Sequence, residues 1–168
     1  MDFIKVQTDD NIARTSLMAK QIWHEHYDGI IGAAQVDYML DKFQSEQAIR
    51  SQIGKKWLYY ILSDNDRTIG YIALEPQPQD NAMLLSKYYI YKESRGKGYG
   101  RQCMDFVESV CRKMGLETLW LTVNRNNAAT IRIYEKLGFE NKGSVKADIG
   151  NGFVMDDYKM VKKIEQKG

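Results

Sequence analysis

A glycine-rich turn between a strand-like run and a helix-like run is the feature that most constrains the fold of this chain. Residues 95–100 read Arg-Gly-Lys-Gly-Tyr-Gly, after the apolar and aromatic residues 83–91 and before the amphipathic residues 99–114. A strand, a tight turn and a helix in this order aim several unpaired backbone N–H groups at one point. The turn therefore predicts an α/β fold with an anion site at the start of this helix.

Positive charge surrounds the same turn. Lys92, Arg95, Lys97 and Arg101 lie in it or beside it, and Glu93 is the single nearby acid in the sequence. Cations gathered at a helix N-terminus favour a phosphate or diphosphate as the ligand.

Two nucleotide-binding motifs share the strand, turn and helix order, and neither fits. Gly96, Gly98 and Gly100 give G-x-G-x-G, whereas a dinucleotide fingerprint needs G-x-G-x-x-G and an acid at the end of the next strand. That strand ends here at Val123-Asn124. A P-loop is excluded as well, because no Lys-Ser or Lys-Thr pair follows the glycines.

Composition limits the class of protein. With 43% apolar and 27% charged residues, residues 1–168 are predicted to form a single domain. The 24 basic and 22 acidic side chains nearly cancel, so we expect no nucleic acid partner and no membrane partner. The N-terminus lacks a signal-peptide pattern and no apolar run is long enough to span a membrane, which favours a cytoplasmic protein.

The two cysteines are expected to be reduced. Cys103 and Cys111 are eight residues apart on one predicted helix, which separates them by about 12 Å, beyond the roughly 7 Å limit for a disulfide. Cysteine, histidine and acidic residues do not recur at metal-ligand spacing, so we expect no metal site.

Hydrophobic periodicity and turn residues predict strands and helices in a definite order. The first strand covers residues 2–7, and a helix begins after Thr8 and is broken by Gly29 and Gly32. Residues 75–81, which hold both prolines, are predicted to be a loop. The other elements are helices at 35–43, 45–54, 99–114 and 127–137, and strands at 57–63, 68–75, 83–91, 118–123, from 139 and 154–164. This order predicts an α/β sandwich around a mixed sheet.

Two motifs resemble one known family. The segment R-G-K-G-Y-G, preceded by the apolar strand KYYIY, is similar to the Arg/Gln-x-x-Gly-x-Gly/Ala signature of the GNAT superfamily of N-acetyltransferases. Residues 124–140, NRNNAATIRIYEKLGFE, look like its other motif, in which an Asn opens a helix and a Tyr precedes a Gly-Phe pair. The resemblance implies a mixed, mostly antiparallel sheet of about seven strands flanked by about four helices.

The family transfers an acetyl group from acetyl-CoA to an amine by direct attack through a tetrahedral intermediate. The resemblance implies that the amides of the glycine turn and its cations hold the pyrophosphate. It also implies that the backbone of residues 89–91 pairs with the pantetheine arm. The implied cofactor-binding residues are Tyr89, Ile90, Tyr91, Arg95, Gly96, Lys97, Gly98, Tyr99, Gly100, Arg101 and Asn127.

Two catalytic roles follow from the same resemblance. The N–H near Ile90 stabilises the oxyanion, and Tyr134 donates a proton to the departing thiolate. The base is left open, because relatives often carry a glutamate where this chain has Ser86 and Lys87. Candidates that act through water are Glu75, His24, Glu25 and His26.

The acceptor is the least determined part. Residues 23–38 and 147–157 correspond to the acceptor regions of the family, and the likeness to bacterial enzymes predicts a small-molecule amine such as a polyamine. A protein N-terminus or lysine is an alternative, and so is a non-catalytic CoA-binding module. Related proteins are often dimers, and a homodimer is compatible with the exposed aromatic residues.

Overall fold

A computed structural model describes residues 1–166, and within them seven strands form one sheet in the order β1-β2-β3-β4-β5-β7-β6. The β4–β5 pair is parallel, whereas β1–β2, β2–β3, β5–β7 and β6–β7 are antiparallel. The described residues hold five α-helices, where the resemblance implied about four. The fold class, a mixed and mostly antiparallel sheet with flanking helices, is confirmed. The bounds are β1 Asp2–Lys5, α1 Asp9–Ile31, α2 Ala33–Phe43, α3 Glu46–Gly54, β2 Leu58–Asp64, β3 Arg67–Gln77, β4 Ala82–Ile90, α4 Tyr99–Lys113, β5 Thr118–Asn124, α5 Ala128–Lys136, β6 Glu140–Gly150 and β7 Phe153–Lys163.

The chain forms two compact units, each built from two segments. The first unit holds Met1–Glu75 and Lys87–Tyr99, and the second holds Pro76–Ser86 and the described part of Gly100–Gly168. The expectation that residues 1–168 are a single domain stays a prediction.

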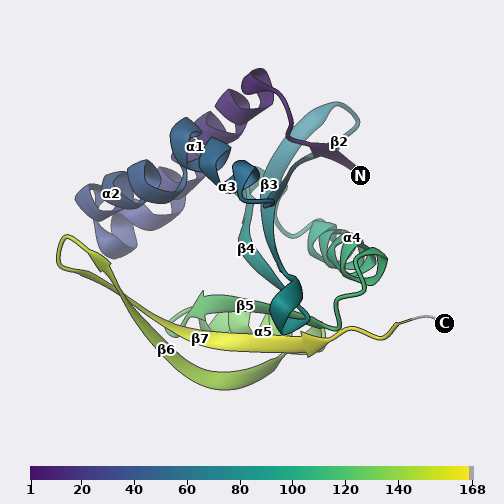
Figure 1. The fold of residues 1–168 in the computed structure, drawn as a ribbon. Coiled ribbons are helices and arrows are strands. Elements are labelled where there is room, and N and C mark those ends of the chain that lie inside the picture. Colours follow the sequence, from purple (N-terminus) through teal and green to yellow (C-terminus); the bar gives the residue numbers. More distant parts are fainter. Residues whose placement is uncertain (167–168) are drawn as a thin grey trace. The chain divides into compact units, whose positions relative to one another are not determined.

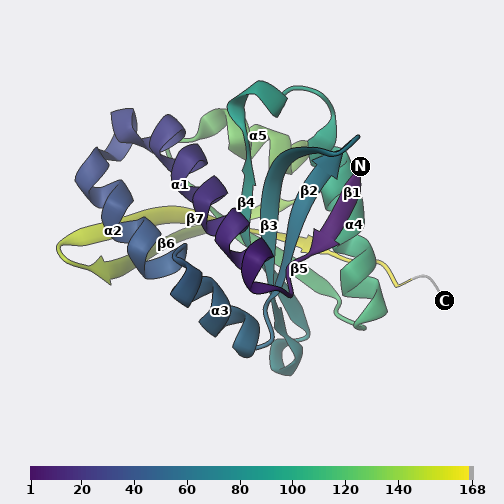
Figure 2. The same cartoon turned by 90° about the horizontal axis from the view of Figure 1, so that it is seen from above.

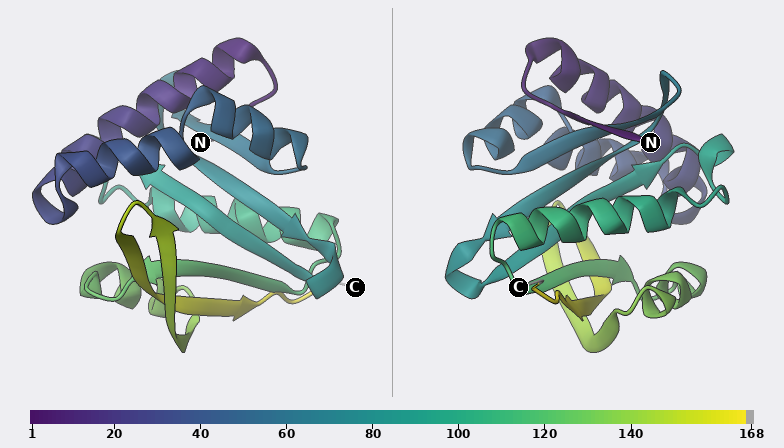
Figure 3. Two further views of the ribbon diagram at one scale, coloured as in Figure 1. Left: turned by 60° about the vertical axis from the view of Figure 1, so that its left-hand side comes forward. Right: turned by 90° about the vertical axis from the view of Figure 1, so that its right-hand side faces the viewer.

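Three helices of the first unit lie together on one face of β2 and β3 (Figures 2 and 3). The Thr8 hydroxyl caps α1 by accepting from the Asn11 N–H at 3.2 Å, and Asp9 and Asp10 favour its positive N-terminus. The helix runs through Gly29 and ends at Gly32, whose φ of +87° suits glycine. The predicted break at Gly29 was therefore wrong. The buried face of α1 repeats at helical spacing: Ile12, Thr15, Met18, Ala19, Ile22 and Trp23.

The predicted proline loop is partly a strand. β3 continues through Pro76 to Gln77, and only Pro78–Asp80 form a short 3₁₀ turn. The register between β2 and β3 ends at Leu58↔Leu74, so the missing N–H of Pro76 costs no hydrogen bond to β2. The sequence could not show where this pairing ends.

Close approach of β4 explains one glycine of β3. A Cβ atom at Gly70 would lie 2.2 Å from the backbone oxygen of Tyr89, far inside van der Waals contact. Only glycine lets the end of β4 lie this near to β3.

The second unit contains a long β6–β7 hairpin that pairs with β5 (Figure 1). Asn151 and Gly152 have φ of +52° and +77°, which suits a two-residue hairpin turn, as the sequence indicated. Cys103 and Cys111 are buried on α4, and the structure shows no disulfide between them. None of the helices in residues 1–166 has the length and apolar character that crossing a membrane requires.

Lys87 is buried in the first unit and is 4% exposed. Its Nζ donates to the Phe43 carbonyl, to the Tyr59 hydroxyl and to Gln52 Oε1 at 2.9 Å. Three oxygens thus satisfy the three donors of the ammonium group. Burial nevertheless lowers the pKa of Lys87 to about 7 from its ordinary 10.5.

The stability of the protein should therefore depend on pH through Lys87. Between pH 7 and 10.5 the unfolded state binds the proton and the folded state does not, so the free energy of unfolding rises with pH, by at most about 1.4 kcal/mol per unit. We expect this slope to be lost in Lys87→Met and kept in Lys5→Met, which changes an exposed lysine. Urea unfolding at pH 7.5 and 9.5 measures it, and equal slopes in all three proteins would contradict the account.

Candidate functional site

The glycine turn of the first unit has a backbone that suits glycine at two positions. Gly96 and Gly98 have φ of +73° and +81°, in the left-handed region that other residues adopt only with strain. An added Cβ at either position would meet no atom within 4 Å. Both glycines are therefore set by backbone conformation, and the space beside them is open.

The amides of this turn are available to a ligand. In residues 1–166, the N–H groups of Gly96, Lys97 and Gly98 donate to no backbone carbonyl, and α4 begins directly afterwards at Tyr99. The Tyr99 hydroxyl donates to Asp64 Oδ2 at 2.6 Å, which fixes the helix start to the end of β2. Unpaired amides at a helix N-terminus form an anion site.

Cations lie beside these amides. Arg95, Lys97 and Arg101 are exposed, and the Arg95 Nε also donates to the Ile90 carbonyl at 3.3 Å. That bond holds the Arg95 side chain against the end of β4, next to the turn in sequence. The chemistry fits a phosphate or diphosphate.

At the end of β4, one backbone N–H group is directed away from β3. The Tyr91 N–H donates to the Ile69 carbonyl of the β3 side at 2.9 Å. Because N–H groups alternate in direction along a strand, the Ile90 N–H points to the opposite edge. Among the described residues, pairing of β4 with β5 extends only from Ala82 to Leu84, so Ile90 is not one of the paired residues.

The Tyr89 side chain packs against other aromatic rings, in addition to the backbone role predicted for this residue. Its ring contacts Trp23 and Tyr71, with centroids 5.2 and 5.5 Å apart. Of the three residues expected to pair with pantetheine, Ile90 thus has its N–H directed away from β3, whereas the Tyr91 N–H is already used.

The second unit holds the other expected residues, Asn127 and Tyr134. The Asn127 side chain caps α5 by accepting from the Thr130 N–H at 3.3 Å, which is the helix-start role that the sequence predicted. Tyr134 is half-buried in the last turn of α5, and its ring packs edge-on against Phe139, with centroids 5.5 Å apart. The Phe139 N–H in turn donates to the Tyr134 carbonyl at 3.0 Å.

Comparison with known proteins identifies this arrangement. Residues 20–139 match the Acetyltransferase (GNAT) family. The chain belongs to the GNAT family. A relative of this GNAT protein, the ribosomal protein bS18-alanine N-acetyltransferase of Escherichia coli K12, is 30% identical over 102 residues, which make up 61% of this chain and 67% of the relative.

Two solved structures share the GNAT fold over nearly the whole chain. The PaiA N-acetyltransferase of Thermoplasma acidophilum, solved with coenzyme A, has a TM-score of 0.77 at 21% identity, with 97% of this chain and 99% of that chain covered. The ribosomal-protein-S18-alanine N-acetyltransferase of E. coli has a TM-score of 0.71 at 22% identity, with coverages of 99% and 96%. At these identities the likeness establishes the fold.

A GNAT protein is an acetyl-CoA-dependent N-acetyltransferase, and the residues of the turn fit that cofactor. Three amides without backbone acceptors, open space beside Gly96 and Gly98, and the cation of Arg95 suit its diphosphate. The assignment of single residues to acetyl-CoA stays a prediction, because no ligand contact tests it.

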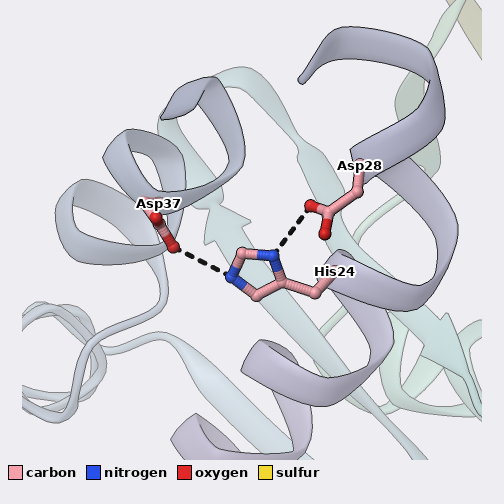
Figure 4. A network of polar contacts seen from close by, with 3 residues as sticks. All are labelled: His24, Asp28 and Asp37. Carbon is pink, nitrogen blue, oxygen red and sulfur yellow. Dashed lines mark hydrogen bonds and ion pairs between the residues drawn. The ribbon is translucent and has the colours of Figure 1, made fainter. Parts of the chain in front are cut away.

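The histidines proposed as bases in this GNAT enzyme differ in environment. His24 lies between α1 and α2, where its Nδ1 is 2.7 Å from Asp28 and its Nε2 is 2.9 Å from Asp37 (Figure 4). Both nitrogens can donate only in the imidazolium form, and these partners raise the pKa of His24. Burial, followed by the charge of Arg95, lowers the pKa of His26. His24 therefore has no ring nitrogen left to take a proton, whereas His26 is largely neutral at pH 7.

The two histidines should affect stability with opposite dependence on pH. Because the folded pKa of His24 is raised, its bridge stabilises the protein fully below about pH 6.5 and is lost as pH rises through the folded pKa. We expect His24→Gln to lower stability by about 0.5–1 kcal/mol at pH 5.5 and by less at pH 8.5. His26→Gln, the control, should show the reverse trend. Thermal unfolding of both variants at the two pH values measures this, and a larger His24→Gln effect at pH 8.5 would contradict it.

One buried carboxylate of the enzyme was not singled out from the sequence. Asp157 on β7 is the only carboxylate among the described residues that is buried. Burial, opposed by a hydrogen bond with Thr122, raises the pKa of Asp157. The adjacent aspartates Asp156 and Asp157 within β7 were the signal available, but only the register to β5 shows which of them is buried.

Proposed function

We propose that this GNAT enzyme transfers an acetyl group from acetyl-CoA to a primary amine, with the glycine turn as the grip on the cofactor. The observation that carries the proposal is the set of unpaired amides at Gly96, Lys97 and Gly98 beside exposed cations. Acetyl-CoA, when bound, supplies an activated acetyl thioester. The other cofactor-binding candidates are Tyr89, Ile90, Tyr91, Arg95, Tyr99, Gly100, Arg101 and Asn127.

Two groups of the chain then serve the chemistry. The Ile90 N–H, which points away from β3, donates a hydrogen bond where negative charge develops on the acetyl oxygen. The Tyr134 hydroxyl donates a proton to the leaving sulfur. Packing against Phe139 restricts the Tyr134 ring, which reduces the cost of orienting its hydroxyl.

The acceptor favoured by the relatives is a peptide α-amino group. The E. coli relative of 30% identity is named for acetylating the alanine of ribosomal protein bS18. An α-amino group has a pKa of about 8, whereas a lysine side chain has a pKa of about 10.4. At neutral pH a larger fraction of the α-amino group is therefore in the neutral, nucleophilic form.

A small cationic amine, which the sequence predicted as the acceptor, is the second candidate. It is supported by a groove of about 340 Å³ between α1, α2 and the start of α3 in the first unit. Asp37, Asp41 and Glu46 line it, with Lys20 as its cation. A polyamine has the charge to bind such a groove.

Thiol release from acetyl-CoA tests the function and ranks the acceptors. We expect release with a short peptide that begins with alanine, at a kcat/KM about tenfold or more above that for spermidine. A preference for spermidine would reverse the order of acceptors. An absence of release with both, while acetyl-CoA binds by calorimetry, would contradict the proposed function.

A further inference from the structure

Asp157 occupies a position that its packing alone does not explain. It is 7% exposed, yet the structure shows no lysine or arginine within 4.0 Å of its carboxylate in residues 1–166. Its neighbour Asp156, by contrast, lies 3.1 Å from the Arg125 Nε. A buried carboxylate without a cation is unfavourable, and an incoming cation would offset this cost.

The strand register shows which face of the sheet holds this carboxylate. Asp157 is directly opposite Asn124 of β5, and cross-strand partners share a face. Along β5, Leu119, Leu121 and Val123 are buried, whereas Thr122 and Asn124 on the alternate face are exposed. Asp157 therefore lies on the face of the sheet on which Thr122 and Asn124 of β5 are exposed to solvent.

Further along the same face the second unit is hollowed. A cavity of about 360 Å³ is lined by Trp120, Lys159 and Val161, which alternate with the buried residues of β5 and β7. The Lys159 Nζ lies over the Trp120 ring at 4.4 Å, so this cation is held there. This cavity lies toward the start of β5, at Thr118 and Trp120, whereas Asp157 lies on the same face at the other end of the strand, opposite Asn124.

The same end of β5 leads to the proposed proton donor. Asn124 ends β5, its carbonyl accepts from the Asn127 N–H at 3.0 Å, and α5 with Tyr134 begins one residue later. The Arg125 N–H donates to the Asp156 carbonyl at 3.3 Å, which fixes this connection to β7 beside Asp157. Asp157 and the helix that carries Tyr134 are therefore anchored at one end of the same strand.

We propose that Asp157 is a catalytic residue that binds the acceptor ammonium and takes its proton, with Thr122 holding the carboxylate in place. In this step an N–H bond of the ammonium breaks, an O–H bond forms on Asp157, and the nitrogen keeps the electron pair with which it attacks. The proton then passes from Asp157 to water. The inference rests on the proposed function, since it requires an amine acceptor.

Several charged groups set the titration of this carboxylate. Asp156 and Lys159 flank it on β7, Lys146 of β6 pairs opposite Asp156, and Arg125 follows β5. Burial raises the pKa of Asp157, the hydrogen bond from Thr122 lowers it, and the charge of Asp156 raises it further. Removal of that bond in Thr122→Val should therefore move the acid limb of the pH profile of kcat/KM to higher pH.

Asp157→Asn in the full-length protein tests the proposal, with Asp156→Asn as the matched control. The acceptor is an alanine-starting peptide, whose α-amino group has a pKa of about 8. Only its neutral form reacts without a base, and that form rises from roughly 3% at pH 6.5 to about 90% at pH 9. We expect Asp157→Asn to lose about 100-fold in kcat/KM at pH 6.5 and only a few-fold at pH 9, with acetyl-CoA affinity unchanged. Asp156→Asn should stay within about threefold at both pH values.

Equal losses at the two pH values, or a loss no larger than in Asp156→Asn, would overturn the role of Asp157. A second readout does not depend on activity: carboxyl ¹³C titration of the free protein, with the signal assigned by its absence in Asp157→Asn, should give a pKa above the ordinary value. An unshifted titration overturns the proposal. If the wild-type enzyme binds acetyl-CoA but releases no thiol with either acceptor, the proposed function fails first, and the inference fails with it.

Discussion

Replacement of Tyr134 by phenylalanine is expected to lower kcat about 100-fold while the Kd for acetyl-CoA stays within about twofold. The substitution removes only the hydroxyl, which is assigned to the leaving sulfur, and general acid catalysis contributes typically 10²- to 10⁴-fold. The ring still packs against Phe139, whose edge-on contact does not use the hydroxyl, so α5 should keep its position. An interaction made only in the transition state lowers kcat and kcat/KM together.

Tyr60→Phe is the matched control, because Tyr60 is a half-buried tyrosine on β2 that has no assigned chemical role. It should leave kcat within about twofold. Steady-state thiol release gives kcat, and calorimetry gives the Kd. Normal turnover in Tyr134→Phe would remove Tyr134 from the proton transfers.

The elements of the fold were predictable because their signals are local. Helical spacing with the Thr8 cap predicted α1, and the aromatic and β-branched run before the glycine turn predicted β4. The helix start at Asn127 and the turn at Asn151 and Gly152 have short-range sequence signatures, and the structure has both.

The errors and omissions depend on long-range contacts. Gly29 reads as a helix breaker, but packing of α1 extends the helix past it. Pro76 reads as a loop residue, but it lies in β3 beyond the last pair with β2. The His24 contacts with Asp28 and Asp37 require α2 to lie beside α1, and the burial of Asp157 requires the register of β7 with β5. No local sequence pattern contains the packing of α2 beside α1 or the register of β7 with β5.

The turn at Gly96 and Gly98 should set the affinity for acetyl-CoA. Alanine is strained by about 1–2 kcal/mol in the left-handed conformation at each position. The turn of the double variant should therefore leave this conformation, and acetyl-CoA binding must restore it at that energetic cost. Together the two costs, about 2–4 kcal/mol, correspond to a Kd roughly 100-fold higher.

Gly115 and Gly152 form a matched control pair, with φ of +70° and +77° and no atom within 4 Å of an added Cβ. Their double alanine variant carries the same backbone strain outside the turn, so it should lose stability without losing affinity.

Calorimetric titration of acetyl-CoA into the wild type and these two double variants is the most direct test of the glycine turn as the cofactor grip. We expect Gly96→Ala/Gly98→Ala to weaken binding about 100-fold and Gly115→Ala/Gly152→Ala to leave the Kd within about twofold. Equal affinity in all three proteins, or equal losses in both variants, would contradict it.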